Sequence, residues 1–573
     1  MKKNNGRRDT ILRYIRVFKG VKLPWILIIL AIIASLAAAS SEIEVATMTG
    51  TIIDASQNAI RGSELISYIR ATAVVAVLTV CESYFSRKME ETVNLRIRVK
   101  LWKKIMRLPT AFYDKDNGNE LVSRVTSDAA SPSALVVTIM TCITSVGAVV
   151  QSFIRLYDTN EMLANYSLLI VPVILAVFVL YSIFQFKLGV YSTTVIAGSL
   201  GYLAERVRNF RLIKSSVSEQ IEAKKGSGAF KKMYFAEFIS WSMTSMFQII
   251  SSFSFIMFIF IVFVLGGQLV RKGELTIGDL TSFYMITSVV SMHLGLLFIN
   301  SGSIFATVGS MKKISEIMDT PSEPEGGKPV PAVCADIVFD GVSFAYNEER
   351  DVVRDVSVRI PMGKVTAVIG GNGAGKTTLF KLISRLYEPK SGKVTFSGDD
   401  ISEYSLSDWR DRFAYVSQNR PLIGGTVREN ITYGLGREVS DEELIEVAKK
   451  ANCYDCIMEK PNGFDEDVGL GGSNFSGGQG QCISIARAML KNADYLLLDE
   501  ATSNLDALSE AQVTEALAKL TENKTTVMIA HSYAATKNAD NIIVMKDGCV
   551  EAVGSPAELL ENNEYYRVFS KTM

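Results

Sequence analysis

The 573-residue sequence predicts an all-α domain of six membrane-spanning helices followed by an α/β domain with a largely parallel sheet. Two observations lead to this fold class. Apolar residues make up 48% of the chain, and all segments long enough to cross a bilayer lie in its first 320 residues. Beyond residue 331, short strand-like runs such as Val365–Ile369 and Tyr495–Leu498 alternate with helix-like segments, which is typical of a parallel sheet covered by helices.

Six apolar segments approach the roughly 20 residues that span a bilayer as a helix. The loops after the second and fourth segments are long and basic, and the N-terminus is basic too, so the positive-inside rule predicts that all three are cytoplasmic. We therefore expect a multi-pass protein of the cell (plasma) membrane with a cytoplasmic N-terminus and a cytoplasmic α/β domain. The predicted spans are residues 23–46, 66–86, 134–156, 163–186, 245–269 and 280–305.

A stretch rich in proline and glycine separates the two predicted domains. Residues 319–329 contain three prolines and two adjacent glycines, and the composition changes across them from apolar to mixed polar. We expect the transmembrane domain to occupy residues 1–320, the linker 321–331 and the α/β domain 332–573.

Charge and cysteine content argue against two classes of protein. The 60 basic residues balance 60 acidic ones, so a nucleic-acid binder with a global positive field is not expected. The seven cysteines have no repeating spacing, which argues against a disulfide framework and favours a reducing cytosol around the α/β domain. Cys453 and Cys456 form a C-x-x-C pair, for which an ordinary pair on a helix face is favoured over a zinc or redox site.

A glycine-rich run follows the strand-like stretch Val365–Ile369 and precedes the helix-like stretch Leu379–Leu386. With the spacing G-x-x-x-x-G-K-[ST], backbone N–H groups converge on phosphate oxygens at a helix N-terminus, which predicts a nucleoside triphosphate site. We expect Lys376 to reach the outer phosphates and Thr377 to ligate Mg²⁺. The run consists of Gly370, Gly371, Asn372, Gly373, Ala374, Gly375, Lys376, Thr377 and Thr378.

Two carboxylates follow the buried strand-like run Tyr495–Leu498. Downstream of a phosphate loop, Asp499 is placed to hold the Mg²⁺ shell and Glu500 to polarise an attacking water.

Between these motifs, Asn474–Gln479 resembles the signature motif of the ATP-binding cassette (ABC) family, with Phe475 where the family usually has Leu. Further elements are similar in order: Tyr346 resembles the aromatic residue that stacks on adenine, Gln418 the glutamine loop, 503–506 the D-loop and His531 the switch histidine. The membrane half resembles the exporter type of the family, through 112–114, 118–128 and 273–280.

The resemblance implies a set of roles for these residues, with ATP and Mg²⁺ as cofactors. Ser476 and the N–H groups of Gly477 and Gly478 would donate to the γ-phosphate of ATP held by a second subunit. One chain supplies six spans and one cassette, so the working unit would be a dimer. The resemblance implies catalytic roles for Glu500, His531 and Gln418, metal binding by Thr377, Gln418 and Asp499, and nucleotide contacts by Tyr346, 370–378, Ser476, Gly477, Gly478, Gln479 and Asp506.

Besides Phe475, two positions depart from the family pattern. Gly480 stands where Arg or Lys is usual, and a glycine there could weaken the start of the signature helix. Leu470 replaces the acid of the exporter segment Val-Gly-Glu-x-Gly. Because Glu500 and His531 are both present, an inactive ATPase is not expected. Heterodimeric exporters commonly pair such a complete chain with a degenerate half-transporter, and a homodimer is favoured over that arrangement.

The resemblance implies an ATP hydrolase that exports an amphipathic small molecule, drug, peptide or lipid from the cytosol. The alternatives are an importer on the exporter fold, one half of a heterodimeric exporter, or an ATP-gated channel or regulatory membrane protein. Expected partners are a second half-transporter, membrane lipid and the cargo. Glu42, Glu82 and His293 are candidate cavity residues, since ionisable groups within spans tend to face a cavity or interface. For Glu42, the favoured interpretation is a carboxylate solvated at the end of a span. For His293, it is a hydrogen-bonded position in the core.

Overall fold

The computed structural model describes residues 17–56, 62–115, 121–122, 125–126, 128–169, 171–347, 350–417, 422–500, 502 and 505–571. The chain divides into two compact units. The first comprises Met1–Leu108 with Asp116–Pro321, and the second comprises Pro109–Lys115 with Ser322–Met573.

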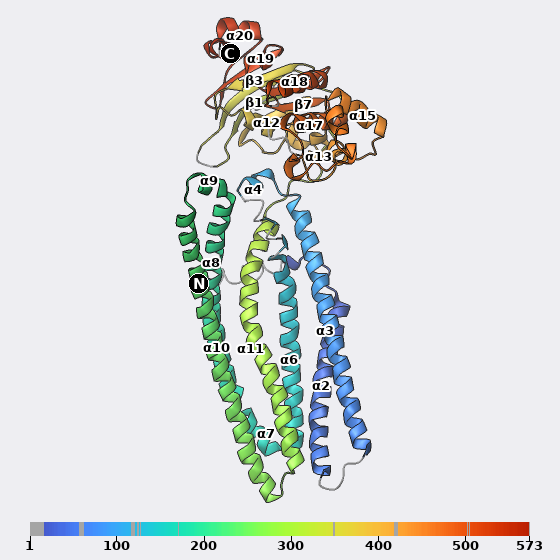
Figure 1. The fold of residues 1–573 in the computed structure, drawn as a ribbon, viewed down its shortest axis with the longest axis vertical. Helices are drawn as coiled ribbons and strands as arrows, with labels where there is room; N and C mark the ends of the chain where they lie inside the picture. Colours follow the sequence, from blue (N-terminus) through green and yellow to red (C-terminus); the bar gives the residue numbers. More distant parts are fainter. Residues whose placement is uncertain are drawn as a thin grey trace. The chain divides into compact units, whose positions relative to one another are not determined.

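The first unit is helical, and six of its described helices are long and apolar enough to cross a membrane, which confirms the predicted class. Helix α2 packs against α3, α6 and α11, while α8 packs against α10, as Figure 1 shows. Small buried residues on α2, including Ala31, Ala38 and Ala46, allow these neighbours to approach closely. The helices are α2 (Trp25–Ala55), α3 (Gly62–Ile105), α6 (Ser131–Thr159), α7 (Glu161–Leu168), α8 (Val171–Arg208), α9 (Phe210–Ser215), α10 (Glu219–Lys272) and α11 (Ile277–Asp319).

The predicted fourth span, 163–186, is wrong at its start. The side chain of Asn160 accepts a hydrogen bond from the N–H of Leu163 and caps a separate short helix, α7, that ends at Leu168. Helix α8 begins anew at Val171. Pro172 has no N–H to give to the carbonyl of residue 168, and a proline is tolerated in the first turn of a new helix, so the break falls here.

A carboxylate of α2 binds the beginning of α11. Asp54 accepts hydrogen bonds from the Thr276 hydroxyl (2.6 Å) and from the backbone N–H of Gly278 (2.7 Å). Close packing accompanies these bonds, because a Cβ on Gly50 would lie 2.3 Å from the carbonyl oxygen of Gly278. Thr276 also forms a capping box with Asp279 at the N-terminus of α11. The ends of α2 and α11 are therefore joined by both hydrogen bonds and backbone contact.

The second unit is an α/β structure, as predicted. Its strands form a four-stranded antiparallel sheet, β2-β1-β4-β5, and a six-stranded sheet, β10-β9-β3-β8-β7-β6, that is parallel apart from β10. The strands are β1 (Ile337–Phe344), β2 (Val353–Ile360), β3 (Val365–Gly370), β4 (Ser391–Phe396), β5 (Asp399–Asp400), β6 (Phe413–Val416), β7 (Tyr495–Asp499), β8 (Thr525–Ile529), β9 (Asn541–Lys546) and β10 (Cys549–Gly554).

Helices flank the six-stranded sheet (Figure 1). The interior strands β3 and β7 have near-continuous buried apolar runs, as expected for parallel strands covered on both faces. The helices are α4 (Thr110–Lys115), α12 (Lys376–Ile383), α13 (Leu406–Asp411), α14 (Val427–Ile431), α15 (Asp441–Lys450), α16 (Tyr454–Met458), α17 (Gly477–Lys491), α18 (Ala507–Thr521), α19 (Tyr533–Thr536), α20 (Pro556–Asn562) and α21 (Glu564–Phe569).

Candidate nucleotide site

The predicted phosphate loop connects β3 to α12, so it lies at the carboxyl end of a central parallel strand and at a helix N-terminus. Two of its glycines are required by the backbone. Gly375 caps α12 with a φ of 99°, and a Cβ on Gly370 would lie 2.2 Å from the carbonyl oxygen of Met545. The loop therefore has the local geometry expected for a phosphate site.

Lys376 is buried at the start of α12. Its Nζ donates to the carbonyl oxygens of Gly370 (2.8 Å) and Gly371 (3.1 Å). Burial lowers the pKa of Lys376, and the nearby carboxylates of Glu500 and Asp499 oppose this shift. The loop lysine, the predicted metal ligand Asp499 and the predicted catalytic Glu500 therefore share one electrostatic environment.

Asp499 and Glu500 follow β7 and differ in backbone conformation. Asp499 is the last residue of the strand, whereas Glu500 has a φ of 47°, in the left-handed region that non-glycine residues rarely adopt. Oε1 of Glu500 lies 2.6 Å from Nε2 of His531. The sheet explains this contact, because β7 pairs with β8 through Asp499 and Ile529, and His531 comes two residues after β8.

Tyr415, which sequence reasoning missed, contacts Asp499. Its hydroxyl donates to Oδ2 of Asp499 at 3.0 Å. Burial raises the pKa of Asp499, and the hydrogen bond from Tyr415 opposes this shift. Burial, with the Asp499 charge, also raises the pKa of Tyr415, so its hydroxyl keeps its proton at neutral pH.

Tyr346 lies beside the phosphate loop, as its predicted role requires. Its hydroxyl is 3.2 Å from Oγ1 of Thr378, and its ring packs edge-to-face on Phe344 and Tyr387. Nζ of Lys381 lies 4.9 Å from the centre of the Tyr346 ring, within the range of a cation–π interaction. An adenine base that stacks on this ring would meet Lys381 as a neighbour.

The residues around Tyr346 also contact α4. The Tyr387 hydroxyl donates to the carboxylate of Asp114, and Nζ of Lys381 lies 3.9 Å from the same carboxylate. Nothing in the local sequence around Tyr387 indicates this contact.

The predicted signature residues form the beginning of α17. Ser476 is the N-cap, its hydroxyl accepts from the N–H of Gln479, and the Gln479 side chain accepts from the N–H of Ser476. Gly478 packs so closely on α18 that an added Cβ would lie 2.5 Å from Cβ of Ser509. Within the described residues, no hydrogen bond joins 476–479 to the phosphate loop of the same chain.

Asp506 caps α18 by accepting from the N–H and the hydroxyl of Ser509 (3.0 and 2.7 Å), and these bonds lower its pKa. The predicted catalytic and metal residue Gln418, like 503 and 504 of the D-loop, lies outside the described residues.

The two departures from the family pattern differ in their surroundings. Helix α17 continues without a break through Gly480 to Lys491, although a glycine was expected to weaken its start. A Cβ at position 480 would lie 3.6 Å from Cδ1 of Leu422, an ordinary contact. Leu470 is 92% exposed within a 3₁₀ turn, so an apolar side chain stands free where the family has an acid.

The candidate cavity residues lie on three helices of the first unit. Glu42 lies on α2, Glu82 on α3 and His293 on α11. Glu42 lies about 20 Å and Glu82 about 30 Å along these helices from the segment that connects α2 to α3. Nδ1 of His293 is 3.4 Å from the Ser145 hydroxyl, while its buried Nε2 has no hydrogen-bond partner among the described residues.

The donor set near the phosphate loop fits Mg²⁺. The Thr377 hydroxyl and the Asp499 carboxylate are hard oxygen donors at the adjoining ends of α12 and β7, and Mg²⁺ usually binds one or two such groups together with substrate phosphates. The described residues contain no cluster of three or more His, Cys, Asp or Glu side chains able to hold a metal by themselves.

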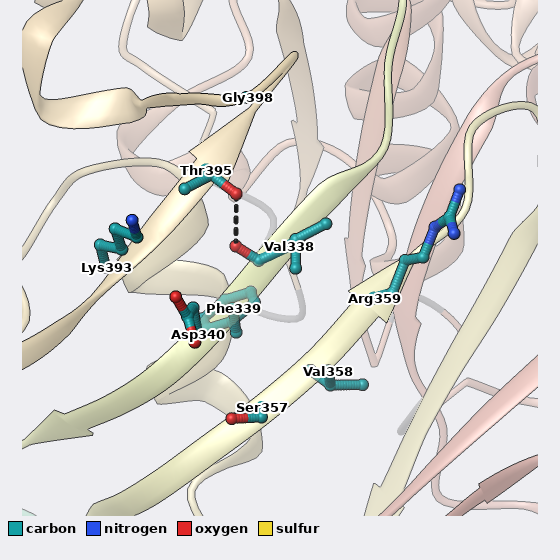
Figure 2. Close-up of a pocket in the computed structure, with 9 residues that line it drawn as sticks. All are labelled: Val338, Phe339, Asp340, Ser357, Val358, Arg359, Lys393, Thr395 and Gly398. Carbon is teal, nitrogen blue, oxygen red and sulfur yellow. Dashed lines mark hydrogen bonds between the residues drawn. The ribbon is translucent and has the colours of Figure 1, made fainter.

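A hollow of about 550 Å³ lies over the antiparallel sheet. Figure 2 shows the residues that line it. Its polar lining includes Asp340, Arg359 and Lys393, which project from neighbouring strands. None of the nine residues that line it is a predicted site residue. They are Val338, Phe339, Asp340, Ser357, Val358, Arg359, Lys393, Thr395 and Gly398.

Comparisons with known proteins match both halves of the chain. Residues 25–294 match the family described as "ABC transporter transmembrane region", and residues 353–503 match "ABC transporter". The chain is 27% identical to a multidrug resistance ABC transporter ATP-binding and permease protein of Lactococcus lactis, over 98% of this chain and 95% of that protein. It is 32% identical to an ATP-dependent lipid A-core flippase of Francisella tularensis, over 86% of this chain and 82% of that protein.

Proposed function

Because the chain belongs to the ABC transporter family, as an exporter-type half-transporter with fused membrane and ATPase parts, we propose specific roles for the residues of its nucleotide site. The chain is a multi-pass membrane protein that hydrolyses ATP to drive export. One observation carries the proposal: the Glu500–His531 contact of 2.6 Å beside a buried phosphate-loop lysine.

In the proposed mechanism, Lys376 leaves the carbonyls of Gly370 and Gly371 and donates to the outer phosphates of ATP. The backbone N–H groups of 371–376 hold the remaining phosphate oxygens, and Tyr346 stacks on the adenine. Glu500 accepts a hydrogen bond from the attacking water and orients it towards the γ-phosphate. His531 holds the Glu500 carboxylate in position through Nε2.

Thr377 and Asp499 are proposed to hold Mg²⁺, with Gln418 as a further ligand. The bound ion would neutralise charge on the β- and γ-phosphates.

We propose that two copies of this chain form the working unit. Ser476, Gly477 and Gly478 of one copy would donate to the γ-phosphate bound by the other, and the intact capping box supports a formed helix N-terminus there. Since Glu500 and His531 occur in the same chain, two copies provide two complete sites. This favours a homodimer over a heterodimer with a degenerate half-transporter.

The proposed topology places the N-terminus and the ATPase domain in the cytoplasm and the spans in the cell membrane. The basic loops after the second and fourth spans support this orientation. We propose domain limits at 1–320 and 332–573, joined by 321–331, a segment without helix or strand of its own.

The proposed cargo is an amphipathic small molecule, drug, peptide or lipid. Relatives that are named for multidrug resistance and for lipid A-core flipping support this class. The carboxylates of Glu42 on α2 and Glu82 on α3, within helices long and apolar enough to span a membrane, favour a cationic group on the cargo. The variants Glu42→Gln and Glu82→Gln should therefore lower the stimulation of ATPase by cationic amphiphiles more than by neutral ones, and an unchanged preference would contradict this choice.

The first test is Mg-ATP hydrolysis by the full-length chain alone in lipid nanodiscs, beside Glu500→Gln. We expect turnover in the wild type, and in Glu500→Gln ATP binding without turnover, because the amide cannot accept the proton of the attacking water. Binding without turnover in the wild type would contradict the homodimer and indicate a missing partner or a gating role. Rapid turnover by Glu500→Gln would remove Glu500 from its proposed role.

A further inference from the structure

The register of the parallel sheet brings Tyr415 to Asp499. Tyr415 on β6 pairs with Leu497 on β7, and Leu497 and Asp499 lie on the same face of β7 because they are two residues apart. Asp499 is therefore the diagonal cross-strand neighbour of Tyr415, within reach of a long side chain. The hydroxyl donates to Oδ2 at 3.0 Å, a contact that this register allows.

The contact is specific within its surroundings. In the described part of the chain, Tyr415 is the residue that donates a hydrogen bond to the Asp499 carboxylate. Lys376, Glu500 and His531 also act on this carboxylate, but through charge. A hydrogen bond to an ionised oxygen is stronger than a neutral one and restrains the rotation of the carboxylate about its last bond.

We propose that Tyr415 is a positioning residue for the metal site, which holds Oδ2 of Asp499 and so fixes the orientation of a carboxylate that would bind Mg²⁺. The proposal rests on the proposed metal role of Asp499. Partners of ligating carboxylates orient the ligand, and their loss typically lowers metal affinity by about 10- to 100-fold. Tyr415 is 49% exposed, so we expect an effect near the lower limit, about tenfold.

If Tyr415 hindered metal binding instead, its removal would change the metal affinity in the opposite direction. If the phenol hydroxyl competed with the metal for Oδ2, its removal would free a ligand oxygen and strengthen metal binding. Tyr415→Phe keeps the ring and its packing and removes only the hydroxyl, so this variant separates the two roles.

The experiment uses the full-length chain in nanodiscs, with Mn²⁺ as an electron paramagnetic resonance probe and a non-hydrolysable ATP analogue. We expect Tyr415→Phe to raise the half-saturating Mn²⁺ concentration about tenfold, while the affinity for the analogue in metal-free buffer changes less than twofold. Tyr433→Phe is the matched control, because Tyr433 is also exposed and packs on Arg487 rather than on Asp499. It should leave Mn²⁺ binding unchanged.

Asp499→Asn tests the premise separately. If Asp499→Asn weakens Mn²⁺ binding and Tyr415→Phe does not, or if Tyr415→Phe strengthens it, the assignment of Tyr415 is overturned while the metal role of Asp499 stands. If Asp499→Asn leaves Mn²⁺ binding unchanged, the metal role of Asp499 fails and the assignment of Tyr415 fails with it.

Discussion

Gly480 is a position where a single methyl group should stabilise the signature helix. It lies in the first turns of α17, is buried, and has no need of a glycine conformation. An alanine Cβ would lie 3.6 Å from Cδ1 of Leu422, so it would fill space without a clash. We therefore expect Gly480→Ala to raise the stability of the ATPase unit.

The expected increase in the free energy of unfolding has two sources. Replacing glycine by alanine within a helix favours folding by about 0.8 to 1 kcal/mol, because the unfolded chain loses less freedom. Burying one methyl group adds up to about 0.8 kcal/mol. A total of about 1.5 kcal/mol corresponds to a rise in melting temperature of about 3 to 6 °C for a unit of this size.

Gly478 provides a matched control in the same helix. A Cβ there would lie 2.5 Å from Cβ and 2.6 Å from Oγ of Ser509. That hydroxyl is held by its bond to Asp506, so it cannot move aside freely. Overpacking typically costs about 1 to 3 kcal/mol, which exceeds the gain in helix propensity. Gly478→Ala should therefore lower the melting temperature.

The assay is scanning calorimetry of the full-length chain in nanodiscs, with hydrogen exchange of peptides covering 477–491. Gly480→Ala should melt later and exchange more slowly in these peptides, and Gly478→Ala should do the opposite. If both variants shift stability in the same direction, the reasoning from local packing is refuted.

Three further outcomes are expected. Lys376→Ala should weaken binding of a fluorescent ATP analogue at least tenfold, because it removes a charged donor to phosphate; unaltered binding would contradict the phosphate-loop assignment. Asp54→Ala should destabilise the membrane unit by about 2 kcal/mol in a thermal unfolding assay, because two hydrogen bonds to a carboxylate are lost. The control Asp158→Ala removes only an exposed ion pair with Arg155 and should cost less than about 0.5 kcal/mol. Equal losses of stability would argue against the α2–α11 contact. Burial raises the pKa of the Cys482 thiol to about 12, so this thiol stays protonated at pH 7.5. A maleimide should therefore label the exposed Cys549 far faster than Cys482, which mass spectrometry of labelled peptides would check. The labelling rate of Cys482 should rise with pH, and comparable rates for the two thiols at pH 7.5 would contradict the buried environment of Cys482.

The fold class was predictable because its signals are local. A run of apolar residues indicates each span, and the spacing of glycine, lysine and threonine indicates the phosphate loop. The limits of helices were less predictable. Helices α3 and α10 continue far beyond their apolar runs, since main-chain hydrogen bonds do not require apolar side chains. The start of the fourth span was misplaced because a capping asparagine and a proline interrupt an apolar run that hydropathy treats as continuous.

Some residues of the candidate site could be predicted from the sequence, and others could not. Lys376, Asp499, Glu500 and His531 could be named from motif order. The contact of Tyr415 with Asp499 could not, because it depends on β6 lying beside β7 in one particular register, which no local pattern specifies. The left-handed backbone of Glu500 was likewise hidden, because glutamate has no preference for that conformation.

The bonds between Lys376 and the carbonyls of Gly370 and Gly371 bear on how tightly the loop can hold a nucleotide. When nucleotide leaves, the ammonium group returns to these two carbonyl oxygens instead of remaining as a bare buried charge. The lysine therefore exchanges one set of acceptors for another when nucleotide binds or leaves, so the net free energy that its bonds to phosphate add to binding is smaller than their gross strength. The backbone of the loop thus supplies the acceptors that keep nucleotide binding reversible at a site with a buried cation.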